Sequence, residues 1–155
     1  MTGIELNLTT EFVTDLKPEE PIQVDVEQST ESVIDLLREQ KAGAALVNRG
    51  GRLAGIFTER DVLRLLAKGA DLSVPIEQYM GTSVVYLKRT DVVASAITKM
   101  SEGGYRRLPI VDQNGNATAL VTTADVLHYL VEHFPETIYN LPPTTANSVQ
   151  EREGA

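Results

Sequence analysis

The chain has 155 residues, and its 22 acidic residues against 14 basic ones give a formal net charge of −8. A chain of this length buries roughly 70% of the surface that it exposes when unfolded, so one compact domain with a sizeable core is expected. The negative charge excludes nonspecific binding to nucleic acid or to an anionic membrane. The absence of cysteine excludes disulfides, thiolate metal sites and cysteine nucleophiles.

The first residues, MTGIELNLTTEF, are not expected to be a targeting signal, because they lack a basic region and a continuous apolar region. No later segment approaches the ~20 apolar residues that a membrane span needs. We therefore expect a cytoplasmic protein. The alternation of Ile4, Leu6 and Leu8 predicts an edge strand, and KPEEP at residues 17–21 predicts a stiff acidic connector.

A strand and a helix are expected next. Residues 22–26 alternate apolar and polar side chains as in a half-buried strand, and Ser29-Thr30 is typical of a helix N-cap. Gly43 is expected to end this helix. The predicted apolar face of the helix is Val33, Ile34, Leu36 and Leu37.

A β-hairpin and a second helix complete this unit. Residues 44–48 and 52–57 predict two strands, because they are apolar runs separated by Arg-Gly-Gly. The segment Thr58-Glu-Arg-Asp61 then opens a helix. The apolar residues expected on that helix are Val62, Leu63, Leu65 and Leu66.

The same order of elements then begins again. Residues 83–87 predict a strand, Thr90 is expected to cap the following helix, and Gly103-Gly104 is expected to end it. The apolar residues of this helix are Ala96, Ile97 and Met100.

A second hairpin and a last helix complete the repeat. Residues 107–112 and 117–121 predict the two strands, and Asn114-Gly115 between them favours a type I′ turn. Thr122-Thr-Ala-Asp125 opens a helix that is expected to end near Pro135. Its apolar residues are Val126, Leu127 and Leu130.

The two copies are offset by about 64 residues. Identical residues occupy equivalent positions at Val47/Val111, Gly51/Gly115, Thr58/Thr122, Asp61/Asp125, Val62/Val126 and Leu63/Leu127. We therefore predict an α/β (α+β) fold of two β-α-β-β-α repeats packed face to face about a pseudo-two-fold axis. The predicted divisions are an N-terminal extension at 1–12, one repeat at 13–72, the second at 73–136, and a C-terminal extension at 137–155 that is mobile from residue 144.

The repeated Thr-x-x-Asp segment has two interpretations. One is a capping box, which stabilises a helix start by about 1 kcal/mol. The other is a binding site. Gly55 inside a strand is typical of a close approach by a ligand, Arg60 adds a cation at a helix N-terminus that already favours anions, and the unit recurs.

These residues resemble a known family. GAALVNRGGRLAGIFTERDVLRLL and YRRLPIVDQNGNATALVTTADVLHYL look like the two halves of a tandem CBS-domain protein, the pair called a Bateman module. The resemblance covers roughly residues 13–136. It implies two domains packed through their sheets, two clefts between them, and a disc-shaped homodimer. It also implies that the clefts bind AMP, ADP, ATP or a related adenosyl ligand such as S-adenosylmethionine.

The resemblance also implies roles for single residues. Asp61 and Asp125 would accept hydrogen bonds from ribose hydroxyls, a role that suits an ionised carboxylate, and Thr58 and Thr122 would contact ribose or phosphate. The remaining implied contacts are with adenine at Ile22, Val24, Ala44, Val84, Val85 and Pro109, and with phosphates at Arg60, Arg106 and Arg107. The alternative interpretation of the same arginines is that they are solvated surface residues.

The second copy departs from the family's pattern. Ala119 replaces the motif glycine and Ala124 stands at the position of Arg60, while Ala44-Ala45 replaces the Leu-Pro of the second copy. We therefore expect two clefts that are not equivalent.

No catalytic or metal site is predicted. The sequence has no P-loop, no Gly-x-Gly-x-x-Gly and no His-Glu-x-x-His, and His128 and His133 are expected on a surface or interface. The prediction is a homodimeric regulatory module, not an enzyme, that needs no cofactor, binds an adenine nucleotide and acts on an unidentified protein. The alternative is a scaffold or interaction protein that keeps the fold without the ligand.

Overall fold

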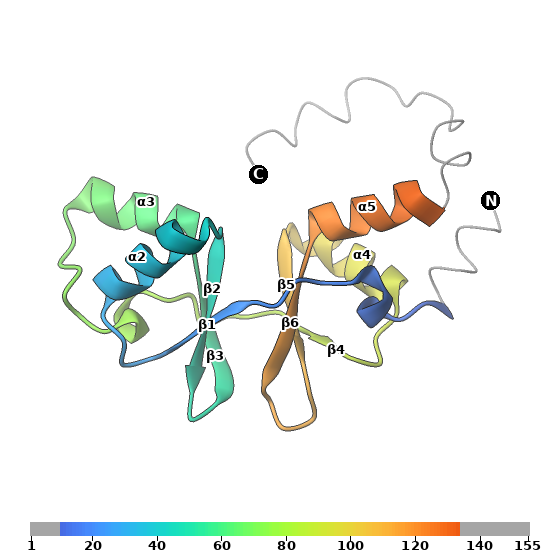
Figure 1. Cartoon of the computed structure of the whole chain (residues 1–155), viewed down its shortest axis with the longest axis horizontal. Helices are drawn as coiled ribbons and strands as arrows, with labels where there is room; N and C mark the ends of the chain where they lie inside the picture. Colours follow the sequence, from blue (N-terminus) through green and yellow to red (C-terminus); the bar gives the residue numbers. More distant parts are fainter. Residues whose placement is uncertain (1–9, 134–155) are drawn as a thin grey trace, which may run out of the picture.

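The computed structural model describes residues 10–133. It consists of two halves, each with a three-stranded sheet and two helices, whose helices lie at one end of the molecule and whose hairpin turns lie at the other (Figure 1). The strand orders are β1-β2-β3 and β4-β5-β6, and each sheet has a parallel pair followed by an antiparallel pair. The predicted pair of similar halves is confirmed.

The first half begins with β1 (Ile22–Asp25) and α2 (Thr30–Gln40). Ser29 caps α2 as predicted, because its hydroxyl accepts the Ser32 N–H over 3.2 Å. The helix ends before the predicted stop at Gly43. Lys41 adopts a left-handed φ of 52°, and its N–H donates to carbonyls of the last helical turn.

The hairpin of the first half has β2 (Ala44–Arg49) and β3 (Arg52–Thr58), and α3 (Glu59–Lys68) follows directly. Gly50 and Gly51 make the turn with φ values of 58° and 83°, a conformation that favours glycine. The hairpin and the helix start are as predicted.

The second half repeats this order, with one difference at its first strand. Its elements are β4 (Leu87–Lys88), α4 (Val93–Gly103), β5 (Arg107–Val111), β6 (Ala117–Thr122) and α5 (Thr123–His133). The predicted strand at 83–87 is wrong, because only Leu87 and Lys88 pair with β5. The predicted helix end near Pro135, the edge strand over Ile4–Leu8 and the tail lie outside the described residues.

Two local predictions in the second half are also wrong. Thr90 does not cap α4, whose N-cap is Val92; Thr90 lies in a turn that Asp91 closes by accepting the Lys88 N–H over 2.8 Å. The turn at Asn114-Gly115 is not type I′, because that type needs positive φ at both residues and only Gly115 has it. The Asp112 carboxylate fixes the turn instead, by accepting the N–H of Asn114.

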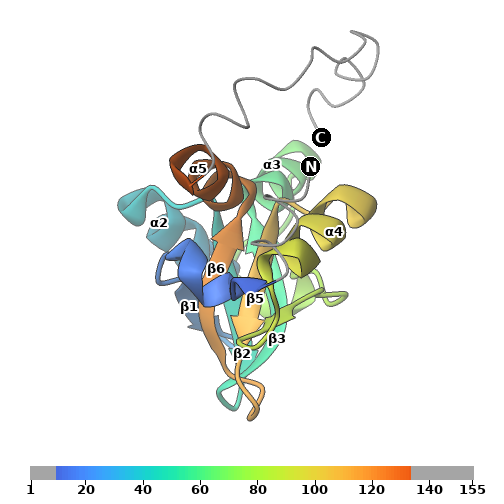
Figure 2. The ribbon, with the colours of Figure 1, turned by 90° about the vertical axis from the view of Figure 1, so that its right-hand side faces the viewer.

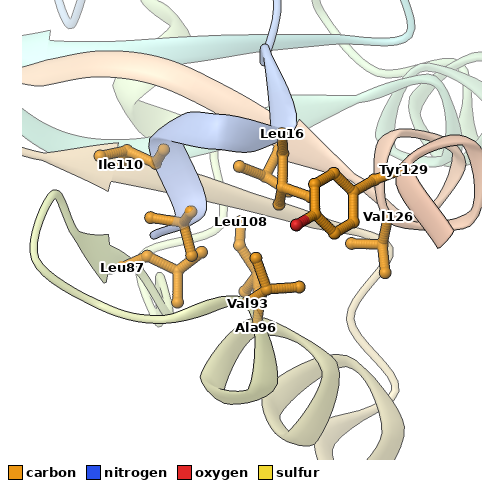
Figure 3. Packing of buried hydrophobic residues seen from close by; sticks show 10 residues of the cluster. Leu16, Leu87, Val93, Ala96, Leu108, Ile110, Val126 and Tyr129 are labelled. Carbon is orange, nitrogen blue, oxygen red and sulfur yellow. The ribbon is translucent and has the colours of Figure 1, made fainter. Parts of the chain in front are cut away.

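Each half has its own hydrophobic core. A short 3-10 helix from the other half of the chain completes each core. Val13 and Leu16 of η1 (Val13–Leu16) belong to the core of the second half, where Figure 3 shows Leu16 beside Tyr129. Ile76 of η2 (Ile76–Gln78) packs with the first half. The linkers also cover outer strands, because Glu19 bridges to Leu120 and Gly81 to Ile56. The two halves are therefore interlocked as well as stacked.

The hairpin ends of the two halves also touch. The Leu53 N–H of β3 donates to the Gly115 carbonyl over 2.9 Å, and Gln23 Nε2 of β1 donates to the Ala117 carbonyl over 3.2 Å. Figure 2 shows both hairpin turns at the same end of the molecule, opposite the helices. The sheets thus face each other, and their helix ends form two similar corners where a ligand could bind.

Candidate ligand-binding site

The first candidate corner is the junction of β3 and α3. The Thr58 N–H donates to Asp61 Oδ2 over 2.9 Å, and the Thr58 hydroxyl lies 3.1 Å from the same oxygen. Asp61 Oδ1 lies 3.5 Å from Arg64 Nη1, and the Asp61 side chain is 20% exposed. Because a carboxylate has about four acceptor positions, Asp61 caps the helix and keeps acceptor capacity toward solvent.

The second corner, between β6 and α5, has nearly the same geometry. The Thr122 N–H donates to Asp125 Oδ2 over 2.8 Å, and the Asp125 N–H donates to Thr122 Oγ1 over 3.2 Å. Both Thr-x-x-Asp segments are therefore capping boxes in this structure. The helix-cap interpretation of the motif is confirmed, and a ligand would have to use the oxygens that the cap leaves open.

The sheet register brings several predicted contact residues to these corners. Ala44 is the register partner of Thr58, and Arg107 is the register partner of Thr122. Val24 packs inside the first core and Pro109 is buried, so their side chains are covered by protein. Among the predicted adenine contacts, the half-buried residues that present some surface are Ile22, Val84 and Val85.

Arg107 crosses from the second half to the first corner. A Cβ atom placed on Gly43 would overlap Arg107 Nη2 and would stand 3.3 Å from Arg107 Cζ and 3.1 Å from Glu59 Oε1. The Glu59 N–H, at the start of α3, donates to the Gly43 carbonyl over 3.1 Å. A guanidinium of one half thus lies beside the helix start of the other, where an anionic group would be favoured.

The other two predicted phosphate contacts are exposed. Arg60 follows the first residue of α3 and takes part in an interaction of its own. Arg106 precedes β5, and its carbonyl accepts the Thr123 N–H over 3.0 Å at the second corner. Each corner therefore has an exposed arginine close to it along the chain.

Gly55 packs closely against residues 80–81 of the same chain. A Cβ atom at this position would stand 2.5 Å from Met80 Sδ and 2.7 Å from the Gly81 carbonyl oxygen. Packing against the 80–81 segment accounts for glycine here, without a ligand. The equivalent Ala119 is half-buried at the edge of the second core, so its methyl group is accommodated there.

Comparison with known proteins agrees with this arrangement. The family model described as "CBS domain" matches residues 13–68 and again residues 76–132. The chain belongs to the CBS-domain family. It is 31% identical over 127 residues to the CBS domain-containing protein YhcV of Bacillus subtilis, an alignment that covers 81% of this chain and 84% of that protein.

Solved CBS proteins have the same fold. A CBS domain protein from Pyrobaculum aerophilum, complexed with AMP, superposes with a TM-score of 0.69 at 22% identity over 78% of this chain and 98% of that one. The cytosolic domain of the Mg²⁺ channel MgtE, in complex with ATP, gives 0.62 at 27% identity over 71% of this chain and 45% of that one. The CBS pair predicted from sequence is confirmed.

The CBS pair has a second surface feature that the sequence analysis did not identify. Leu63 and Leu66 of α3 are 67% and 59% exposed, and Leu127 of α5 is 61% exposed, although the sequence indicated all three only as apolar residues of these helices. Leu63 lines a groove of about 560 Å³ between α2 and α3, and Leu127 lines one of about 480 Å³ between α4 and α5. The sequence contained a signal for this feature, because leucine stands at the equivalent position in both copies, at Leu63 and at Leu127.

The described part of this CBS pair has no candidate metal site. Residues 10–133 contain no group of three or more His, Asp or Glu side chains placed to hold a metal ion. His133 stacks on Tyr129 with ring centroids 4.1 Å apart, and His128 is exposed. Among the same residues, no helix is both long and apolar enough to cross a membrane.

Proposed function

We propose that this CBS pair is a regulatory module that binds an adenine nucleotide at its strand-to-helix corners. The observation that carries the proposal is the repeated capping box, in which a partly exposed aspartate is fixed at the start of α3 and again at the start of α5. An ionised carboxylate only accepts hydrogen bonds, so it suits the two hydroxyls of a ribose. Asp61 and Asp125 take this role, with Thr58 and Thr122 beside the ribose or phosphate.

The phosphate end of the ligand would meet positive groups from both halves. Arg107 lies over Gly43 at the first corner, and Arg60 and Arg106 are exposed near the first and second corners. A planar guanidinium binds phosphate oxygens in pairs. The AMP and ATP complexes of the two solved relatives support this class of ligand for the present chain.

The two corners are not equivalent in this proposal. Ala124 stands where the first corner has Arg60, and Gly43 is replaced by Arg107 at the equivalent position of the second half. We therefore expect two different affinities, with one corner filled before the other.

We also propose that two copies of the chain join through their helices. Exposed leucines occur at the same position in both repeats, so one face carries two similar apolar patches, and a two-fold dimer buries both at once. Ligand binding would then favour one packing of the halves, and a partner protein of the cytoplasm would respond to it. The coupling cannot exceed the difference in the ligand's affinity for the two packings.

The first test is thermal unfolding of the full chain with AMP, ADP, ATP, S-adenosylmethionine, NADH and cyclic dinucleotides. A ligand at 100 times its dissociation constant adds about 2.7 kcal/mol to the free energy of unfolding. For a domain of this size that corresponds to a rise in melting temperature of roughly 5 to 10 °C. A selective rise supports the sensor, and a flat panel contradicts it.

The second test separates binding from capping. Asp61→Ala with Asp125→Ala should weaken binding of the selected nucleotide at least tenfold while the chain stays folded. Ser29→Ala is the matched control, because Ser29 caps α2 away from both corners and its loss also costs about 1 kcal/mol. Equal affinity in the double variant and the control would contradict nucleotide binding at the corners and support the scaffold function, in which the two aspartates act only as helix caps.

A further inference from the structure

A basic cleft lies at the hairpin end of the second half, away from both corners. The cleft has a volume of about 660 Å³. It is lined by Arg52 of β3 in the first half, and by residues of β4, of the turn after β4 and of the β5–β6 turn in the second half. Lys88 pairs with Val111 at one end of β5, whereas Arg107 pairs with Thr122 at the other. The cleft and the second corner therefore lie at opposite ends of the same sheet.

Three cations line this cleft, in a chain whose net charge is −8. Arg52, Lys88 and Arg89 form no ion pair with any of residues 10–133. The one carboxylate of the lining, Asp112, already accepts two N–H groups, from Asn114 over 2.9 Å and Asn116 over 3.0 Å. The positive charge of the cleft is thus only partly offset.

Arg52 is held in place by the contact between the two hairpins. Its Nε atom would stand 2.8 Å from a Cβ placed on Gly115, so the guanidinium packs directly on that glycine. The adjacent Leu53 N–H donates to the Gly115 carbonyl over 2.9 Å and fixes the backbone of both turns. A guanidinium positioned in advance loses less conformational entropy when it binds an anion.

The remaining lining fits a small organic phosphate. Tyr86 is 46% exposed and presents an aromatic ring beside the cations, and Thr90 and Gln113 add a hydroxyl and an amide. The volume falls within the ~300–1,000 Å³ of small-molecule sites. Arginine and lysine together are the residues that recognise phosphate groups.

We propose that this cleft binds the di- or triphosphate part of a small molecule, as a second site independent of the Thr-x-x-Asp corners. The charges of Arg52, Lys88 and Arg89 hold the phosphates, and Tyr86 lies beside whatever group the phosphates carry. Because Arg52 comes from the hairpin of the first half and the other two cations come from β4 and the turn after it, an anion in the cleft joins the two halves.

The test is a titration of the ¹⁵N-labelled full chain with inorganic pyrophosphate, followed by NMR. We expect saturable shifts of the amides at residues 88–90 and 113–115, and a dissociation constant at least tenfold higher when Arg52, Lys88 and Arg89 are all changed to Gln. The matched control changes Arg38, Lys41 and Lys68 to Gln, which removes the same charge from the α2–α3 side. All six side chains are exposed, so both variants should fold.

The proposal is overturned if the two triple variants bind equally or if the shifts map only to residues 58–61 and 122–125. Asp61→Ala with Asp125→Ala should leave pyrophosphate binding at the cleft unchanged, which separates this site from the proposed nucleotide site. A parallel titration with ATP identifies the source of the phosphates. Tighter binding with a shift at Tyr86 indicates a nucleoside polyphosphate, and equal binding indicates the free polyphosphate anion.

Discussion

The side chain of Gln23 in β1 joins the two halves, because its Nε2 atom donates to the carbonyl of Ala117 in β6 over 3.2 Å. Its Oε1 atom accepts from Asn48 Nδ2 over 2.7 Å, which orients the amide. The two hydrophobic cores are separate clusters, so contacts of this kind and the exchanged 3-10 helices hold the halves together.

Replacing Gln23 with Ala should therefore weaken the contact between the halves. The variant loses two hydrogen bonds and leaves the Ala117 carbonyl and the Asn48 amide without these partners, so we expect the free energy of unfolding to fall by about 1 to 3 kcal/mol. Urea unfolding measures this change in the free energy of unfolding. Gln113→Ala, at an exposed turn position, is the control. Equal stability of the two variants would mean that the Gln23 bridge contributes nothing.

Gly55→Ala should also destabilise the chain. The new methyl group overlaps the Met80 sulfur and the Gly81 carbonyl oxygen, and Gly81 cannot move freely because it exchanges two backbone hydrogen bonds with Ile56, of 2.9 and 3.0 Å. We expect a loss of about 1 to 3 kcal/mol. Ala119→Gly, the reverse change at the equivalent position, should cost only about 0.5 to 1 kcal/mol. Thermal unfolding of both variants compares them, and a smaller loss for Gly55→Ala would contradict the packing role.

The sequence predicted the hairpins and most helices because each has a strong local signal. Alternation of apolar residues, glycines at the first turn and the Thr-x-x-Asp caps act within a few residues of one another, and the second copy supports each assignment. The capping boxes at the candidate site were predictable for the same reason. The arginine of one half that crosses to Gly43 of the other was not, because only the packing of the two halves brings these residues together.

Two features that the sequence did not predict share a physical cause. Residues 83–87 have the composition of a strand, but only Leu87 finds a hydrogen-bonded partner on β5. Val13 and Leu16 gave too short a signal to reveal that they complete the core of the distant half. Whether an apolar residue is paired, buried or exposed depends on which surface meets it, and local periodicity does not contain that information.

The exposed leucines lead to a prediction about assembly. Leu63→Glu with Leu127→Glu places charges in the apolar patches of both repeats, and burying them in an interface would be costly. We expect the wild-type chain to sediment as a dimer and this variant as a monomer with unchanged secondary structure. Gln113→Glu, at the hairpin end, should remain dimeric. A wild-type chain that is monomeric at high concentration would contradict the proposed helix-to-helix dimer.

Tyr129 links α5 to the N-terminal 3-10 helix and should make stability depend on pH in the alkaline range. Its side chain is 4% exposed and packs beside Leu16 (Figure 3). Burial, and then the carboxylates of Glu11 and Asp15, raise the pKa of Tyr129 to about 12 from its ordinary value of 10.0. The folded chain therefore favours the protonated phenol.

The sign of the effect follows from this difference between the two states. Below pH 10 the phenol is protonated in both the folded and the unfolded chain, so its contribution is fully present; between pH 10 and about 12 only the unfolded chain ionises, and the free energy of unfolding falls as the pH rises. Tyr129→Phe removes this titration, so its stability should fall less steeply than that of the wild type over this range. Tyr86→Phe, at an exposed position, should follow the wild type. Urea unfolding at several alkaline pH values distinguishes the curves, and an equally steep fall in Tyr129→Phe would show that other groups cause the alkaline loss.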